Sequence, residues 1–387
     1  MKITKILEKS VSLNSNVSNS LINFSTHTVS LIALVTDQVR NGRPVIGLSF
    51  NSIGRYAQSG IIEKRMVPRL LAAKPDSLLQ DNGQLSAEKV LACAMQNEKP
   101  GGHGDRAHAA SGLELAVWDL NAKLNDEPAS VLFARHFGNK HYSPKVSVYA
   151  AGGYYYPGEQ AGRLEKELSA YQALGFNRFK MKIGGATLAE DIKRIERVLS
   201  VVGVGNKLAV DANGRLNLEQ AIAYGRALQP YQLMWYEEAG DPLDYELNSL
   251  LAKEYKGALA TGENLFSHQD VKNLALFGGA RIDLDIFQMD PGLCYGVTEY
   301  ARMLLELESR GFDRKFCYPH SGQLMGLHTV AGLGLGGCEV YPGVFEPIGG
   351  LGDQTTIDDG VVSISSAAGF GFEEKSNLMA HFAALTE

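Results

Sequence analysis

Cysteine is scarce in this chain of 387 residues, and its spacing excludes two kinds of structure. The four cysteines, Cys93, Cys294, Cys317 and Cys338, lie far apart and form no Cys-x-x-Cys motif. Neither a zinc knuckle nor a disulfide framework is therefore indicated. We expect reduced thiols inside the core of a cytoplasmic protein.

Long apolar runs and an excess of positive charge are also lacking. No segment approaches the roughly 18 apolar residues of a membrane span, and the opening MKITKILEKS lacks the apolar stretch of a signal peptide. The net charge of −6 argues against nucleic acid as a partner. With 45% hydrophobic and 21% charged residues, the composition is that of a globular protein, and no membrane partner is expected.

Two patterns of periodicity divide the chain. Period-two segments at 3–11, 29–36 and 44–50 predict a meander of strands, and helical periodicity follows at 62–73, 87–96 and 107–124. Strands followed by helices, without alternation, predict an α+β domain. From residue 146 short apolar strands alternate with helices, which predicts a parallel α/β barrel; the strands are expected at 146–150, 179–183, 208–212, 234–237, 259–261, 286–288 and 316–318.

Three carboxylates end successive strands of this barrel at equal intervals. Asp211 in LAVDANG, Glu237 in WYEEAGDP and Glu263 in ATGENLF are each 26 residues apart. The carboxyl ends of parallel strands meet at one rim, so the three anions are expected to converge and to need a cation. Hard oxygen ligands suit Mg²⁺. Taken singly, each acid could instead be a helix N-cap or a surface charge.

Two lysines share one face of the strand in FKMKIGG. Lys180 and Lys182 are two residues apart, so both side chains point into the barrel if this strand belongs to it. A buried amine beside another ammonium and a cation loses basicity, which favours a neutral amine that can take a proton. The alternative is a pair of lysines on an exposed strand.

His320 follows the apolar run at 316–318, again at a strand end. Asp290 in DIFQMDPG follows the preceding strand, and a carboxylate bonded to one ring nitrogen fixes the tautomer and raises the basicity of the other. The two residues therefore form a candidate acid/base pair opposite the lysines. A lone histidine with a purely structural role is the alternative.

These motifs together resemble a known family. The order Lys-x-Lys, Asp-x-Asn, Glu-Glu, Gly-Glu-Asn, Asp and His resembles the mandelate racemase and muconate lactonizing enzyme group of the enolase superfamily. Within that group, NEKPGGHGD, YAAGGYYYPG, KMKIGG, VDANGR and ATGENLFSHQD resemble the D-tartrate dehydratases over essentially the whole chain. The chain departs from that pattern at Ile53, where the pattern has a polar residue.

The resemblance implies a fold and a reaction. The fold is a (β/α)7β TIM-like barrel at 141–335 with an α+β capping domain at 1–140, to which the segment 336–387 returns. The reaction is a Mg²⁺-dependent dehydration of an acid sugar, D-tartrate to oxaloacetate, in which Lys182 is the base, His320 the acid and Lys180 a stabilising charge. A homo-oligomer is expected for such enzymes.

The resemblance also implies substrate contacts from the capping domain and from loops after the strands. Asn19 and Asn51 are expected to bind substrate hydroxyl or carboxylate groups, and Lys99 a second carboxylate. Tyr155 and Tyr341 are further candidates. Each residue could instead have a purely structural role: the asparagines in loop turns, Lys99 on the solvated surface and the tyrosines in packing.

Several other functions remain open from the sequence. A dehydratase acting on another aldarate or aldonate, or a racemase using the same two residues, would carry the same motifs. A non-catalytic barrel would be favoured if a metal carboxylate or Lys182 were missing, but all are present. A Schiff-base aldolase also uses a barrel lysine, yet it has no need of three acids.

Overall fold

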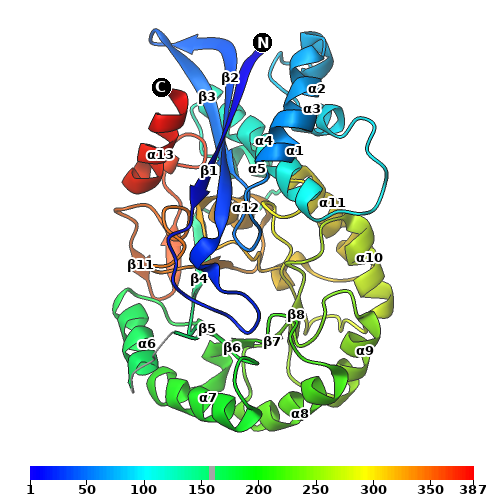
Figure 1. The fold of residues 1–387 in the computed structure, drawn as a ribbon, viewed down its shortest axis with the longest axis vertical. Helices are drawn as coiled ribbons and strands as arrows, with labels where there is room; N and C mark the ends of the chain where they lie inside the picture. Colours follow the sequence, from blue (N-terminus) through cyan, green and yellow to red (C-terminus); the bar gives the residue numbers. More distant parts are fainter. Residues whose placement is uncertain (157–161) are drawn as a thin grey trace.

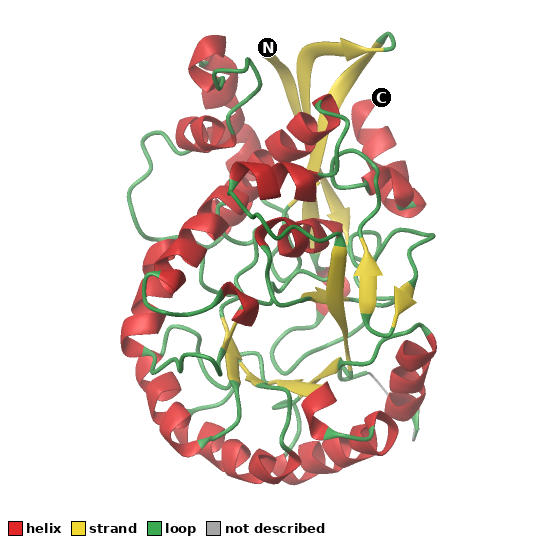
Figure 2. Cartoon of the chain, turned by 180° about the vertical axis from the view of Figure 1, so that it is seen from behind, coloured by secondary structure: helices red, strands yellow, loops and turns green. Residues whose placement is uncertain are grey.

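The computed structural model describes residues 1–156 and 162–387, which fold into two connected parts (Figure 1). One part contains a three-stranded sheet and several helices, and the other is a ring of helices around short strands, seen from behind in Figure 2. The predicted TIM-like barrel with an α+β cap is therefore confirmed. No helix in the described residues is long and apolar enough to cross a membrane.

The capping part begins with an antiparallel meander in the order β1-β2-β3. Its strands are β1 (Ile3–Ser12), β2 (Thr28–Arg40) and β3 (Arg43–Phe50), and its helices are α1 (Ser59–Ile61), α2 (Val67–Ala72), α3 (Ala87–Ala94), α4 (Asp105–Leu124) and α5 (Ala129–His136). A π-helical turn, η2 (Ile62–Met66), joins α1 to α2. The sequence periodicity did not predict α5.

The barrel alternates strands and helices from β4 onward. Its strands are β4 (Lys145–Gly152), β5 (Phe179–Lys182), β6 (Leu208–Asp211), β7 (Tyr236–Glu237), β8 (Leu259–Thr261), β9 (Ile286–Phe287) and β10 (Cys338–Val340). The helices between them are α6 (Arg163–Ala173), α7 (Leu188–Val202), α8 (Leu218–Leu228), α9 (Tyr245–Glu254), α10 (His268–Phe277), α11 (Val297–Glu308) and α12 (Leu324–Leu333). Short 3₁₀ turns lie at η1 (Phe24–Thr26), η3 (Pro75–Leu78), η4 (Gly205–Lys207), η5 (Gln229–Tyr231), η6 (Arg314–Phe316) and η7 (Phe372–Glu374).

Helix N-caps fix where the barrel loops end. Thr187, Asn217 and Ser267 each accept a hydrogen bond from a backbone N–H of the first turn of α7, α8 and α10, and a reciprocal side-chain bond completes each capping box. Each cap lies a few residues beyond β5, β6 or β8. The loops at the carboxyl ends of these strands are therefore short and held at both ends.

The last strand of the barrel is not the one that the sequence predicts. The predicted strand at 316–318 forms only one bridge, between Cys317 and Phe287, because the 3₁₀ turn η6 runs as far as Phe316. The Gly336 N–H donates to the Cys317 carbonyl (3.0 Å), and β10 then pairs in parallel with β4. The last barrel strand is thus β10, which lies beyond the boundary expected at residue 335.

The segment after β10 contacts both parts of the molecule. Strands β11 (Ile357–Asp358) and β12 (Val361–Ser363) form a hairpin that extends the barrel sheet through antiparallel pairing of β12 with β4. The last helix, α13 (Ser376–Thr386), then packs against β1 and β2 beside the N-terminal strands (Figure 1). The capping part is built from both ends of the chain.

Helix α4 docks the capping part onto the barrel through Glu114. This carboxylate is fully buried and accepts hydrogen bonds from the backbone N–H groups of Val297 (3.1 Å) and Thr298 (2.9 Å) at the start of α11. It also accepts from the Thr298 hydroxyl (2.6 Å) and from Trp118 Nε1 (2.7 Å). A side chain of one part therefore caps a helix of the other, whose own N-cap residue, Gly296, has no side chain to do so.

This geometry predicts that Glu114→Gln destabilises the protein. The amide replaces one acceptor oxygen with a donor that faces other donors, so we expect the free energy of unfolding to fall by about 1–3 kcal/mol. Urea unfolding followed by circular dichroism measures this loss. The matched control is Glu88→Gln, an exposed side chain of α3, which should change stability by less than about 1 kcal/mol. Equal effects of the two substitutions would contradict the docking role of Glu114.

Candidate active site

Neighbouring strands bring the predicted lysines and acids together at one end of the barrel. Lys182 on β5 is directly paired with Asp211 on β6, and Asp211 is paired with Glu237 on β7. Glu263 lies two residues beyond the end of β8. In a parallel sheet, residues in register share one face, so Lys182, Asp211 and Glu237 form a row across three strands.

Lys180, two residues before Lys182 on the same face of β5, is enclosed by carboxylates. Its ammonium donates to Glu237 Oε1 (2.6 Å), pairs with Glu339 Oε1 (2.7 Å) and lies 3.5 Å from Asp211 Oδ2. Lys182 Nζ donates to the same oxygen of Asp211 (2.5 Å). Both amines are thus paired with acids, and Lys180 is 1% exposed.

The ionisation of these groups follows from the pairing. Burial alone would lower the pKa of Lys180, but the carboxylates of Glu237 and Glu339 raise it well above its ordinary value. The loss of basicity expected from the sequence is therefore not what the structure gives for Lys180. Burial would raise the pKa of Asp211, yet the ammonium groups of Lys182 and Lys180 lower it.

The acids offer oxygen donors of the kind that bind a cation, and in this structure lysine ammonium groups pair with Asp211 and Glu237. Burial and the neighbouring Asp211 carboxylate raise the pKa of Glu237 to about 8, and further positive charge beside it would favour its ionised form. Within the described residues no three His, Cys, Asp or Glu side chains are grouped as metal ligands. Glu263 instead lies 3.7 Å from His320 Nε2. The chemistry of the oxygen donors suits Mg²⁺.

His320 is held between an acid and a phenol. Its Nδ1 lies 3.0 Å from Asp290 Oδ2, and its Nε2 lies 2.9 Å from the Tyr341 hydroxyl. Asp290 is fully buried and also accepts from the Ser52 hydroxyl (2.6 Å) and the Gly292 N–H (2.6 Å). The predicted pairing of His320 with Asp290 is therefore present, and a loop of the capping part supports it.

The carboxylates around His320 favour the protonated imidazole. Burial would lower the pKa of His320, but the Glu263 carboxylate and the hydrogen bond to Asp290 raise it to about 10. A protonated imidazole at the barrel mouth can donate a proton to a leaving group.

Glu339 on β10 is the residue of this site that the sequence reading missed. Its Oε2 accepts from the Tyr341 hydroxyl (2.9 Å), so it connects Lys180 with the His320 side of the barrel. Burial would raise its pKa, but the charges of Lys180 and His320 lower it. The sequence pattern that could have identified it is an acid between the apolar residues Cys338 and Val340 in GGCEVYPG. This strand has only three residues, too few for its alternating pattern to be recognised.

A cavity of about 350 Å³ opens between this cluster and the capping part. The reactive groups on its barrel side are Lys182, Glu263, His320 and Tyr341, and Asn213, Glu238 and Asn264 lie beside them. The capping part contributes Asn19, Leu21, Ile22, Phe24, Ile53 and Arg55. The cavity thus joins the proposed base and acid to a largely apolar wall.

The predicted substrate residues are only partly brought together. Asn19 and Tyr341 line this cavity, but Asn19 Oδ1 accepts from the N–H groups of Leu21 (2.8 Å) and Ile22 (2.7 Å), as in the loop-turn alternative. Asn51 is fully buried and accepts from the Ser30 N–H (2.7 Å), so its carbonyl serves the cap backbone.

Tyr155 does not face the cavity either. Its hydroxyl donates to Asp191 Oδ1 (2.8 Å) and accepts from the Gly185 N–H (2.9 Å), beside the loop after β5. The preceding residue, Tyr154, lines the cavity instead, with Lys182 Nζ 5.5 Å from its ring centre. Adjacent residues of an extended segment point in opposite directions, so the tyrosine that faces the cavity is Tyr154, one residue before the predicted Tyr155.

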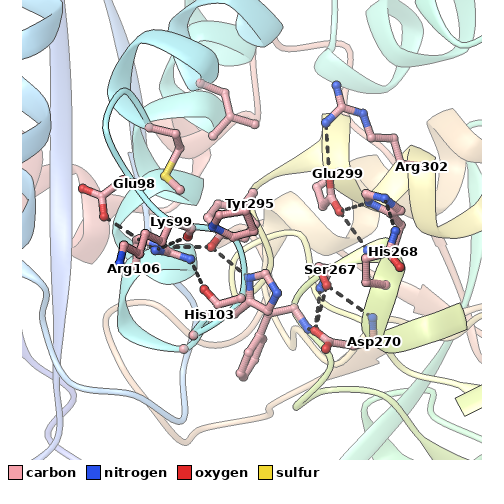
Figure 3. Close-up of a pocket in the computed structure, with 18 of the residues that line it drawn as sticks. Glu98, Lys99, His103, Arg106, Ser267, His268, Asp270, Tyr295, Glu299 and Arg302 are labelled. Atoms are coloured by element: carbon pink, nitrogen blue, oxygen red, sulfur yellow. Dashed lines mark hydrogen bonds and ion pairs between the residues drawn. The ribbon is translucent and has the colours of Figure 1, made fainter. Parts of the chain in front are cut away.

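Lys99 lines a second cavity, of about 870 Å³, between the loop before α4 and the barrel (Figure 3). Arg106 fixes this loop by donating to the carbonyl of Lys99 (2.9 Å) and to the Tyr295 hydroxyl (3.1 Å), and it lies 3.5 Å from Glu98. Lys99 is exposed and belongs to the wall of that cavity, not to the lining around Lys182 and His320.

Comparison with known proteins gives a family match and several relatives. Residues 163–377 match the family described as "Enolase C-terminal domain-like". The L-talarate/galactarate dehydratase of Salmonella typhimurium is 28% identical over 345 residues, covering 88% of this chain and 80% of that enzyme. The arabinonate dehydratase of Saccharolobus solfataricus is 30% identical over 225 residues, or 58% of each chain.

A solved structure extends the likeness to the fold. The Salmonella typhimurium L-talarate/galactarate dehydratase liganded with Mg and L-lyxarohydroxamate superposes with a TM-score of 0.75 at 24% identity. The match covers 95% of this chain and 88% of that chain, so both the barrel and the capping part take part.

The buried charge cluster predicts that Glu339→Ala destabilises the protein. Removing one partner of a buried ion pair leaves the Lys180 charge with less compensation, so we expect the free energy of unfolding to fall by about 3–5 kcal/mol. Urea unfolding measures the change. The control is Glu254→Ala, which breaks the exposed pair with Arg226 and should cost less than about 1 kcal/mol. A loss no larger than the control would show that Glu339 does not stabilise the cluster.

Proposed function

Because the chain belongs to the enolase C-terminal domain-like family, we propose that it is a Mg²⁺-dependent dehydratase of acid sugars. One observation carries the proposal: Lys182 and His320 line a single cavity together with Glu263 at the carboxyl ends of the barrel strands. A candidate base, a candidate acid and the Glu263 carboxylate around one small cavity suit proton abstraction next to a carboxylate. The named activities of the Salmonella and Saccharolobus relatives support the reaction class.

The substrate we propose is D-tartrate, with oxaloacetate as the product. The motifs around Lys182, Asp211 and Glu263 support this choice, since they resemble those of D-tartrate dehydratases. Another aldarate or aldonate is the alternative, as the relatives act on talarate, galactarate and arabinonate.

The reaction begins with removal of the proton next to the substrate carboxylate. Lys182 first leaves its ion pair with Asp211 and releases its own proton to solvent. The neutral amine then takes the substrate proton and leaves a doubly charged enediolate. The buried Lys180 ammonium lies behind Lys182 and contributes fixed positive charge where the negative charge develops. Asp211, Glu237 and Glu263 would hold Mg²⁺, which supplies further positive charge for the carboxylate oxygens when bound.

Loss of the hydroxyl group completes the dehydration. The protonated His320, oriented by Asp290, donates its proton to the hydroxyl on the next carbon, which leaves as water. Tyr341 holds Nε2 of the imidazole at the cavity and would yield that position to the substrate. The resulting enol takes up a proton and becomes a 2-keto acid.

The function is tested by a screen of acid sugars with Mg²⁺. Tartrate stereoisomers, galactarate, arabinonate and galactonate are incubated with the enzyme, and the 2-keto acid is measured as its semicarbazone by absorbance. We expect turnover of at least one acid, with D-tartrate the fastest. Turnover of a longer aldarate alone would change the substrate and keep the mechanism, and silence across the panel would refute the proposed function.

The metal site predicts a loss of both binding and activity on removing one carboxylate. Asp211→Asn, Glu237→Gln and Glu263→Gln should each weaken Mg²⁺ binding in calorimetry at least about tenfold and abolish turnover, because each removes one anionic ligand. EDTA should silence the wild type and Mg²⁺ restore it. Glu254→Gln on exposed α9 is the control. A folded Glu263→Gln enzyme with normal metal affinity and rate would exclude the triad.

The roles of base and acid predict different losses in D₂O. Lys182→Ala should lower both keto-acid formation and exchange of the α-proton at least about 100-fold, since no group takes the proton. His320→Asn should stop keto-acid formation and keep the exchange. Proton NMR of recovered substrate gives the exchange, with keto acid measured in parallel. Exchange that survives in Lys182→Ala and vanishes in His320→Asn would reverse the two assignments.

A further inference from the structure

Arg55 is a charged residue in the reactive cavity that the proposed mechanism does not use. It lies in the loop after β3 and lines the same cavity as Lys182 and His320. We propose that Arg55 binds the remote carboxylate of the substrate, and that the enzyme acts on dicarboxylic acid sugars in preference to monocarboxylic ones. This inference rests on the proposed acid-sugar dehydratase function.

The contacts of Arg55 leave its charge without an anionic partner. Its Nη1 donates to the carbonyl of Gly54 (2.9 Å), and its Nη2 donates to the side-chain oxygen of Asn264. Its guanidinium lies 5.7 Å from the ring centre of Phe266. None of the ion pairs found among residues 1–156 and 162–387 includes Arg55. Its acceptors are neutral, so the guanidinium still attracts an anion.

Asn264 places this charge at the mouth of the barrel. It follows the candidate metal ligand Glu263, and its Nδ2 donates to Glu238 Oε1 (2.8 Å). Arg55 therefore reaches from the capping part to the end of β8. Arg55 lines the cavity from the capping part, whereas Lys182 and His320 line it from the barrel, so we assign the end of the substrate remote from the reaction to Arg55.

The surroundings of Arg55 make an ion pair there effective. The capping residues that share the lining include Leu21, Ile22, Phe24 and Ile53, and Ile53 is only 1% exposed. Charges attract each other more strongly next to apolar walls than in water. Among the described lining residues of the cavity, Arg55 is the one basic side chain that comes from the capping part.

The chemistry of the guanidinium selects a carboxylate. Its planar array of N–H donors matches the two oxygens of a carboxylate, and such paired bonds are among the stronger ones in proteins. A substrate that ends in a neutral CH₂OH group would leave the charge uncompensated. Ile53 offers no hydrogen bond to the substrate hydroxyl groups. The affinity of the capping part for the substrate therefore comes mainly from the pairing of Arg55 with the remote carboxylate.

This assignment replaces the one expected for Lys99. The backbone of Lys99 is fixed by Arg106 at the wall of the other cavity (Figure 3), whereas Arg55 lines the cavity that contains the proposed base and acid. If Arg55 binds the remote carboxylate, its substitution should weaken binding of a dicarboxylate and substitution of Lys99 should not. The earlier expectation for Lys99 is the reverse.

Two matched pairs of acids test the inference. Tartrate and threonate differ by one terminal carboxylate, as do galactarate and galactonate. We expect wild-type kcat/KM with Mg²⁺ to favour the dicarboxylate of the pair that is turned over by at least about tenfold. Arg55→Met should lower kcat/KM for the dicarboxylate about 100-fold, mainly through KM, and should change the value for the monocarboxylate much less.

Three further variants make the test specific. Arg55→Lys keeps the positive charge but lacks the paired N–H donors of the guanidinium, and it should retain more dicarboxylate activity than Arg55→Met. Arg43→Met makes the same exchange on the exposed start of β3 and should leave both acids within about threefold of wild type. Lys99→Met should behave like Arg43→Met. Thermal unfolding checks that each variant is folded.

The outcomes separate this inference from the function on which it rests. If neither these acids nor the rest of the acid-sugar panel are dehydrated, the proposed function fails, and calorimetric binding of tartrate and threonate to wild type and Arg55→Met still decides the role of Arg55. Equal losses for both members of a pair, a wild-type preference for the monocarboxylate, or a selective loss in Lys99→Met instead of Arg55→Met would overturn the inference.

Discussion

The buried ammonium of Lys180 is the interaction on which the architecture of the site depends. It extends from β5 to carboxylates on β7 and β10, so one charge links strands that are far apart around the barrel. Without it, Asp211, Glu237 and Glu339 would place three buried acids close together, and burial of unpaired charge is costly. Hydrogen bonds from Glu339 through Tyr341 then reach His320, so the same charge also positions the opposite side of the cavity.

The capping part does more than cover the barrel. Its loop after β3 supplies Ser52, which supports Asp290 and through it His320, and Arg55, which reaches Asn264 beside Glu263. Helix α4 adds Glu114, whose buried carboxylate caps α11. The docking of the two parts therefore also contributes to the candidate site, because Ser52 of the capping part bonds to Asp290, the partner of His320.

Local patterns predicted well those features that depend on neighbouring residues. The alternation of short apolar runs and amphipathic helices identified the barrel, and the strand-end pattern placed Lys180, Lys182, Asp211 and Glu237 on neighbouring strands, where the structure brings them together. The placement could be predicted because side chains alternate between the two faces of a strand and residues in register share a face. The reading was weaker where an element is very short, as at 316–318, which forms a single bridge, and at β10, where Glu339 was overlooked.

By itself, the sequence determined the fold class and the chemical character of the reactive groups, since periodicity and strand-end residues are local properties. Only the tertiary structure decided which loop residues reach the cavity. Tyr154 faces it and Tyr155 does not, Asn51 serves its own backbone, and Lys99 lies at another cavity while Arg55 lines this one. The reason is physical: a loop side chain takes its direction from the contacts that hold the loop, and those contacts come from distant parts of the chain.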